Sequence, residues 1–310
     1  MISEFGNENQ YNHSSENFIS FVQLGFLKSI DAINNFMYLL GYDKELLSHL
    51  EDINVIIDYT DDFKDNKACY YSNEDGKGFN SIHIAANYLD ELLTTMDICA
   101  DNLVVKYNSI NELATTIVHE LIHSNRDIMI NDSINLNNLA YYQEKLFNYN
   151  DIVLNENFYG VASDNLWDYD IDITKLSKDE IIEYRNKLIN QIGIEEALTE
   201  AFAKIVIFHK NKKDLKIREF CDLELAMRQS DDMKCAYYLI KKMNLDTIRW
   251  FFTSCYEDCY RNEFKTLFGS DYDKVIKHFV NFYNHQYDKP HQEAKCNKLL
   301  RLIDKNMIKK

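Results

Sequence analysis

Residues 109–123 read Ser-Ile-Asn-Glu-Leu-Ala-Thr-Thr-Ile-Val-His-Glu-Leu-Ile-His, and the predicted fold is built outward from this stretch. Ser109 and Glu112 have the spacing of a capping box, which predicts that a helix starts at Ser109. His119 and His123 are four residues apart, so both imidazoles lie on one face of that helix. The apolar residues recur at helical spacing and predict one buried stripe, consisting of Ile110, Leu113, Ala114, Ile117, Val118, Leu121 and Ile122.

The two histidines predict a metal site. Two imidazoles on one helical face can bind a single ion, and Zn²⁺ favours nitrogen ligands at about 2.0–2.1 Å with one position open for water. Glu120 lies beside them, close enough to meet that water without being a ligand. The neighbouring residues 115–118 and 121–122 are uncharged, as a buried active-site helix requires. The alternative is that the two histidines merely pack on a helix.

A catalytic zinc site needs a third protein ligand. A continuation of the form His-x-x-Gly-x-x-His is excluded, because Arg126 and Met129 stand at the two positions. The best candidates are the downstream carboxylates of residues 194–203, where Glu196 and Glu200 share one helical face. Carboxylates turned toward an interior need a cation or a hydrogen-bond donor, so one would bind the ion and the other would accept the second ring N–H of a histidine.

The order of these motifs, HELIH followed by EEALTE, resembles the gluzincins, the thermolysin-like zinc metallopeptidases. In that family the downstream motif is Asn-Glu-x-x-Ser/Thr-Asp/Glu; its Glu binds zinc, and its last acid orients the first histidine. Carried over by position, the resemblance implies His119, His123 and Glu196 as ligands of one Zn²⁺ ion, Glu120 as general base and Glu200 as the acid behind His119. Glu195 stands where the family has Asn, which leaves Glu195 and Glu196 as alternatives for the third ligand.

The resemblance also implies a substrate strand and an oxyanion donor. Residues 79–85 are similar in placement to the family's edge strand, which pairs with an extended substrate backbone. No residue clearly matches the family's His or Tyr that stabilises the oxyanion. The candidates lie in the C-terminal helices: Tyr256, Tyr260, His278 and His285.

The remaining sequence predicts an α+β chain that is predominantly helical. A small N-terminal sheet is expected from a strand at 53–59 and a hairpin formed by 68–72 and 79–85. An amphipathic helix is expected at 18–40, and a second capping box at 177–180 opens a helix to about residue 191. After Gly193, helices are expected at 195–210, 219–243, 245–267, 271–286 and 291–308, with Pro290 separating the last two.

These elements suggest a zincin-like protein in three parts. Residues 1–50 would be an N-terminal helical extension. Residues 51–192 would hold the sheet, the active-site helix and an insertion, and residues 193–310 a helical lobe with the third ligand.

The composition restricts which partners and which cellular compartment are expected. With 34 Lys and Arg against 50 Asp and Glu, the chain carries a net charge of −16, which argues against a nucleic-acid partner. No segment is apolar enough to span a membrane, and the seven scattered cysteines fit a reduced, cytoplasmic protein.

We therefore expect a zinc-dependent metallopeptidase that hydrolyses peptide bonds of a peptide or protein substrate. A sharper form of this hypothesis is that it processes one specific protein, since indiscriminate proteolysis inside a cell would be harmful. The alternative is a zinc-binding pseudo-enzyme or scaffold that acts through protein–protein interaction. The sequence does not predict the cleavage specificity or the oligomeric state.

Overall fold

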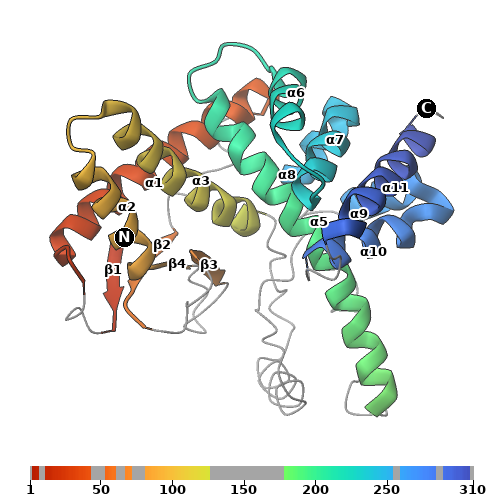
Figure 1. The fold of residues 1–310 in the computed structure, drawn as a ribbon, viewed down its shortest axis with the longest axis horizontal. Coiled ribbons are helices and arrows are strands. Elements are labelled where there is room, and N and C mark those ends of the chain that lie inside the picture. The colour runs from red at the N-terminus through yellow and green to blue at the C-terminus, as the bar shows by residue number, and fades with distance from the viewer. Residues whose placement is uncertain are drawn as a thin grey trace. The chain divides into compact units, whose positions relative to one another are not determined.

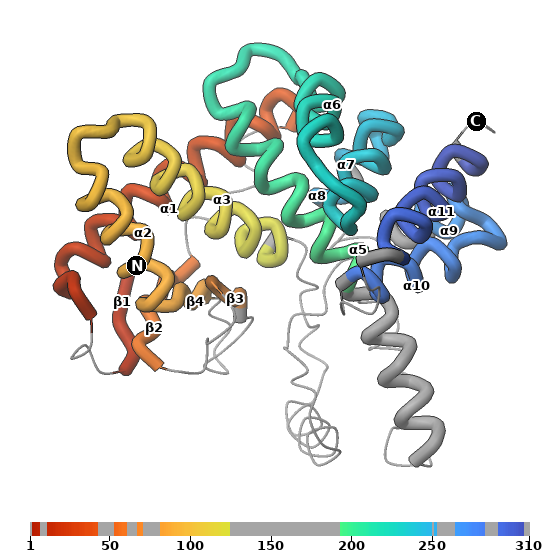
Figure 2. Tube along the Cα trace, in the orientation of Figure 1, coloured from red at the N-terminus to blue at the C-terminus, as the bar shows by residue number. Residues whose placement is uncertain are grey.

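The computed structural model describes residues 2–6, 11–42, 53–60, 67–71, 81–125, 178–253, 259–283 and 289–307. They form mostly helices and one four-stranded sheet, which confirms the predicted α+β class (Figures 1 and 2). Two compact units divide them: the first takes its residues from 1–125 and 202–216, the second from 126–201 and 217–310. Within this described part, no helix is both long and apolar enough to cross a bilayer.

The sheet belongs to the first unit and has the strand order β1-β2-β4-β3. Strands β1 (Ile2–Phe5), β2 (Asn54–Asp58) and β4 (Ser81–Ala85) run parallel, whereas β3 (Ala68–Tyr71) is antiparallel to β4. The predicted strand at 53–59 and the hairpin are thereby confirmed, and β1 is an additional strand. The expectation that residues 79–85 form an edge strand was wrong, because β4 pairs with β2 on one side and with β3 on the other; among the described strands β1 and β3 are the edges.

Besides the end of a helix from residue 202 onward, the described part of the first unit contains α1 (Ser15–Leu39), α2 (Ala86–Ile98) and α3 (Leu103–Asn125). Figure 1 shows them on one side of the sheet, and α1 packs along α3. The predicted helix at 18–40 is confirmed. The helix α2 was not predicted from the sequence, because its N-cap residue, Ala85, has no side-chain oxygen that could accept a capping hydrogen bond. Four sheet residues that share a face are at most 1% exposed and form the core of this unit: Val55, Ile57, Ile82 and Ile84.

The helix with the two histidines starts earlier than predicted. It begins at Leu103, and Ser109 lies buried inside it. The cap is Asn102, whose Oδ1 accepts hydrogen bonds from the backbone N–H groups of Val104 at 3.1 Å and Val105 at 3.3 Å. The capping-box pattern at Ser109 was therefore misleading, because a better-placed Asn side chain lies two turns upstream.

A single helix, α5 (Lys178–His209), replaces the two helices predicted on either side of Gly193. Its residues up to Ala201 belong to the second unit and those from Phe202 onward to the first. Gly193 does not end the helix. A Cβ atom built there would lie 2.7 Å from the backbone of Phe279 and Val280, so glycine is required by close helix packing.

The described residues after Lys216 form the C-terminal helices of the second unit. They are α6 (Ile217–Met227), α7 (Asp232–Lys242), α8 (Leu245–Thr253), α9 (Cys259–Phe268), α10 (Tyr272–Tyr283) and α11 (Lys289–Met307). The helix predicted at 219–243 is divided because the Asp231 side chain accepts the N–H of Lys234 at 2.7 Å and starts α7. Pro290 lies in the first turn of α11, where no helical hydrogen bond is lost.

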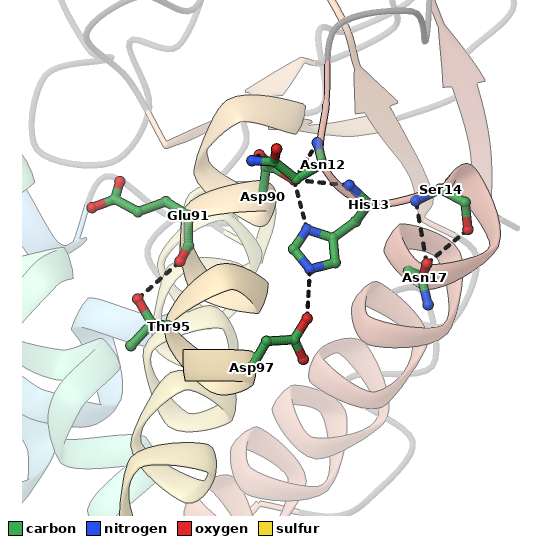
Figure 3. Close-up of polar contacts among 8 residues, drawn as sticks. All are labelled: Asn12, His13, Ser14, Asn17, Asp90, Glu91, Thr95 and Asp97. Carbon is green, nitrogen blue, oxygen red and sulfur yellow. Dashed lines mark hydrogen bonds and ion pairs between the residues drawn. The ribbon is translucent and has the colours of Figure 1, made fainter. Parts of the chain in front are cut away.

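The segment before α1 is fastened to α2 by one carboxylate, Asp90 (Figure 3). Asp90 accepts the backbone N–H groups of Asn12 and His13, each at 3.1 Å, and the Asn12 side-chain amide at 2.9 Å. The His13 ring lies between two acids, with Nδ1 2.6 Å from Asp90 and Nε2 3.1 Å from Asp97. Burial alone would lower the pKa of His13, but the hydrogen bonds and charges of the two carboxylates outweigh it and raise the pKa above 6.5.

We predict that the His13 contact stabilises the protein most at mildly acidic pH. Because the folded-state pKa is raised, the contribution is fully present below the unfolded value of 6.5 and is lost as pH rises through the folded pKa. His13→Gln should therefore lower the free energy of unfolding by about 1 kcal/mol at pH 6, and by less at pH 9. Urea unfolding across this range checks the prediction; a loss independent of pH would contradict it. Asp97→Asn, at an exposed acid, should have the smaller effect.

Gly193→Ala should destabilise the protein by about 1–3 kcal/mol, because the added methyl group meets the backbone of α10. An unhindered Gly→Ala change inside a helix would instead raise the free energy of unfolding by about 1 kcal/mol. A decrease therefore shows that the methyl group is hindered, and an increase would contradict the prediction. Gly25→Ala is the matched comparison, since the atoms nearest to its methyl group belong to the Leu113 and Ile117 side chains and not to a backbone. Denaturant unfolding should rank Gly193→Ala as the more damaging change.

Candidate metal centre

The helix α3 holds the HELIH residues in a largely apolar interior. Val118, Leu121 and Ile122 are fully buried, as the predicted stripe requires. Among the polar members, Glu120 is 7% exposed and His123 is 4% exposed. Polar side chains at this depth need partners, since an unpaired buried charge is costly.

The two imidazoles face each other at the distance expected of two ligands of one ion. Nε2 of His119 lies 3.0 Å from Nε2 of His123, and the ring planes are inclined by 68°. Two nitrogens bound tetrahedrally at 2.0–2.1 Å from zinc are about 3.3 Å apart. The observed separation is close to that value, so a small relaxation would admit the ion.

Glu196 supplies the third candidate ligand. One ligand atom from each of His119, His123 and Glu196 lies within 4.8 Å of the other two. Glu196 lies about one and a half turns before Phe202 on the continuous helix α5. Glu195, the alternative from the sequence, is 3% exposed and does not belong to this cluster.

Two hydroxyls close to these ligands in the sequence are buried. Ser124 follows His123 in the chain, and Thr199 lies between Glu196 and Glu200 on α5. Neither Oγ of Ser124 nor Oγ1 of Thr199 has a hydrogen-bond partner among the described residues. Buried hydroxyl groups of this kind can bind a polar ligand or an ion. With two nitrogens and one carboxylate as donors, the residues fit Zn²⁺.

Glu200, expected as the acid behind His119, lies one turn after Glu196 and is partly buried. Near it is a residue that sequence analysis did not select, Tyr237 of α7, whose ring is fully buried. Burial and the nearby carboxylates Glu224 and Glu200 raise the pKa of Tyr237, so its hydroxyl stays protonated as a donor. No described residue accepts a hydrogen bond from this hydroxyl. The sequence held no signal for Tyr237, one of 21 tyrosines.

Of the four oxyanion candidates, Tyr256 and His285 lie outside the described residues, as does the side chain of Tyr260. His278, on α10, is 7% exposed. Burial, together with Lys298, Lys295 and Lys277, lowers its pKa to about 4, so the ring is neutral at pH 7. His278 is not part of the ligand cluster.

A second histidine–carboxylate pair lies in the sheet. Nδ1 of His83, on β4, is 3.0 Å from Oδ2 of Asp58 at the end of β2, and both side chains are buried. The other oxygen of Asp58 accepts the N–H of Thr60 at 2.8 Å and its hydroxyl at 2.6 Å. Burial alone would raise the pKa of Asp58, but these hydrogen bonds outweigh it and lower the pKa. His83 thus packs within the sheet and lies outside the ligand cluster.

Comparison with protein families, with curated proteins and with solved structures found no match. The interpretation of the cluster therefore depends on its own residues.

We predict that the purified protein binds one zinc ion per chain. His123→Ala and Glu196→Gln should each weaken zinc binding by about 100-fold or more, because each removes one of three ligands. Competition with a chelating dye measures the affinity. His291→Ala, at an exposed position of α11, is the control and should bind zinc as the wild type does. Equal affinities for all four proteins would show that zinc, if bound, is held elsewhere.

Proposed function

We propose that this protein is a zinc-dependent metallopeptidase of gluzincin type. The observation that carries the proposal is the cluster of His119, His123 and Glu196 ligand atoms within 4.8 Å of one another. The helix α3, which holds the two histidines, also carries the buried carboxylate of Glu120 next to His119. Two imidazoles and one carboxylate, with a second carboxylate beside them, are the groups that metal-assisted hydrolysis of an amide requires.

Zinc at this position would polarise the substrate carbonyl and lower the pKa of a water molecule to about 7. The other steps belong to residues of the chain. Glu120 takes the proton from the attacking water and delivers it to the leaving amine. The apolar residues Val118, Leu121 and Ile122 are fully buried and anchor this part of α3, so that Glu120 and the histidines are held in place. Glu200 accepts the second ring N–H of His119 and fixes its orientation.

The edge strand β3 offers a place for the substrate backbone. In the described residues β3 pairs with β4 on one side only, and it packs beside α3, which carries the histidines. An extended peptide can add to such an edge through backbone hydrogen bonds. This takes over the role that the sequence analysis gave to residues 79–85. We propose that a protein segment in extended form is the substrate, and that one specific protein provides it.

The expected place of action is a reducing compartment, the cytoplasm. Five described cysteines carry free thiols, namely Cys69, Cys99, Cys221, Cys235 and Cys296. Free thiols persist where glutathione and thioredoxin keep them reduced.

Glu120→Gln should reduce peptide hydrolysis by about 10²- to 10⁴-fold, because the amide cannot accept the proton of water. Zinc content should remain one ion per chain, since Glu120 is not a ligand. Cleavage of a mixed peptide library, followed by mass spectrometry with zinc-loaded protein, measures the activity. His291→Ala is again the control and should cleave as the wild type does.

Two outcomes would overturn this function. If the wild type holds zinc but cleaves neither peptides nor unfolded proteins, the zinc-binding scaffold or pseudo-enzyme becomes the better explanation. If Glu120→Gln cleaves as fast as the wild type, the activity does not come from this site.

A further inference from the structure

Two cysteines far apart in the sequence meet in the second unit. Cys235 of α7 and Cys296 of α11 are both fully buried, and their sulfur atoms lie 3.4 Å apart. Both thiols are free. A disulfide bond has a sulfur–sulfur distance of about 2.05 Å, so closing the pair requires a movement of little more than 1 Å.

The helices that carry these thiols are already held together elsewhere. Oδ1 of Asp304, farther along α11, accepts the hydroxyl of Tyr238 at 2.7 Å and lies 3.0 Å from Nζ of Lys242. Both partners are on α7, seven residues or fewer from Cys235. The Asp304 contacts therefore keep α7 and α11 in register while the two sulfur atoms face each other. A packed, pre-aligned pair can form a cross-link with little loss of native geometry.

The two thiols differ in acidity. A thiolate at Cys296 accepts the S–H hydrogen bond of Cys235 and lies near Lys234, and both effects lower the pKa of Cys296. The same hydrogen bond, together with burial, raises the pKa of Cys235. Cys296 is therefore the sulfur that attacks, and Cys235 the one that resolves the product.

We propose that Cys235 and Cys296 form a redox-active dithiol that small-molecule disulfides, such as glutathione disulfide, convert into an intramolecular disulfide. The Cys296 thiolate attacks one glutathione sulfur, breaks its disulfide bond and releases a glutathione thiolate. Cys235 then loses its proton and attacks the sulfur of Cys296, which releases the second glutathione. Two protein thiols are oxidised, one glutathione disulfide is reduced, and the two protons end on the glutathione thiolates.

Cross-linking would join α7 covalently to α11 and thereby stabilise the second unit. In cytosolic proteins, bonds of this kind usually serve redox sensing or catalysis. The proposal is independent of the zinc-dependent activity, because neither cysteine belongs to the cluster of His119, His123 and Glu196.

Incubation of the full-length protein with glutathione disulfide, followed by alkylation and peptide mass mapping, tests the proposal. We expect one cross-linked peptide pair, Cys235–Cys296, with a mass two hydrogens below the sum of its reduced peptides. The reaction should be slow, since both sulfurs are buried and react only when the helices open. The oxidised protein should unfold about 5–10 °C higher than the reduced protein.

Cys221→Ala is the matched control. Cys221 is equally buried, contacts no other cysteine of the described chain, and burial raises its pKa to about 12. Cys221→Ala should still form the cross-link, whereas Cys235→Ala should not, and should not gain stability on oxidation. Peptide mapping of the wild type shows whether the Cys235–Cys296 disulfide forms, even if Cys235→Ala fails to fold. Cysteines 235 and 296 that stay reduced, or that pair with other cysteines, would overturn the proposal.

Discussion

Two imidazole nitrogens held 3.0 Å apart on a buried helix are the constraint on which the candidate site depends. At that distance the two rings must share a proton or a cation, because two lone pairs facing each other in a low-dielectric interior repel. One helical turn fixes the spacing, and His123 is buried while His119 is partly buried. A divalent cation placed between these two nitrogens and the Glu196 carboxylate would satisfy all three groups at once.

The helix α5 carries Glu196 and also makes packing and polar contacts at other turns. Glycine at position 193 allows the backbone of α10 to approach, and Glu196 follows one turn later. At the end of the helix, the carbonyl of His209 accepts the side-chain amide of Asn35 at 2.7 Å, and its ring packs on Phe36 of α1. Burial lowers the pKa of His209 to about 4, so this end remains uncharged within the apolar interior. One helix therefore supplies a close packing contact at Gly193 and a candidate metal ligand one turn later at Glu196.

The sequence was most informative where one local pattern suffices. The spacing of His119 and His123 predicted that these two side chains share one face of a helix, because helical periodicity alone determines this. Glu196 lies on another helix, and its role as a ligand was implied by the downstream motif and its resemblance to the gluzincins. The predicted helix boundaries were wrong where contacts in the folded protein determine them. Asn102 caps α3 upstream of the capping-box pattern at Ser109. Gly193 lies inside α5, where it lets the backbone of α10 approach closely. The Tyr237 hydroxyl and the Cys235–Cys296 contact come from residues brought together over long separations, which no periodicity reveals.

The uninterrupted course of α5 also limits how this chain can change in evolution. Insertion or deletion of one residue between Glu196 and Phe202 would turn the carboxylate by about 100° around the helix axis and shift it by about 1.5 Å. Neither movement can be absorbed by a loop, since the segment contains none. Related sequences should therefore tolerate substitutions in this stretch while keeping its length, and length variation should fall in the connections between helices.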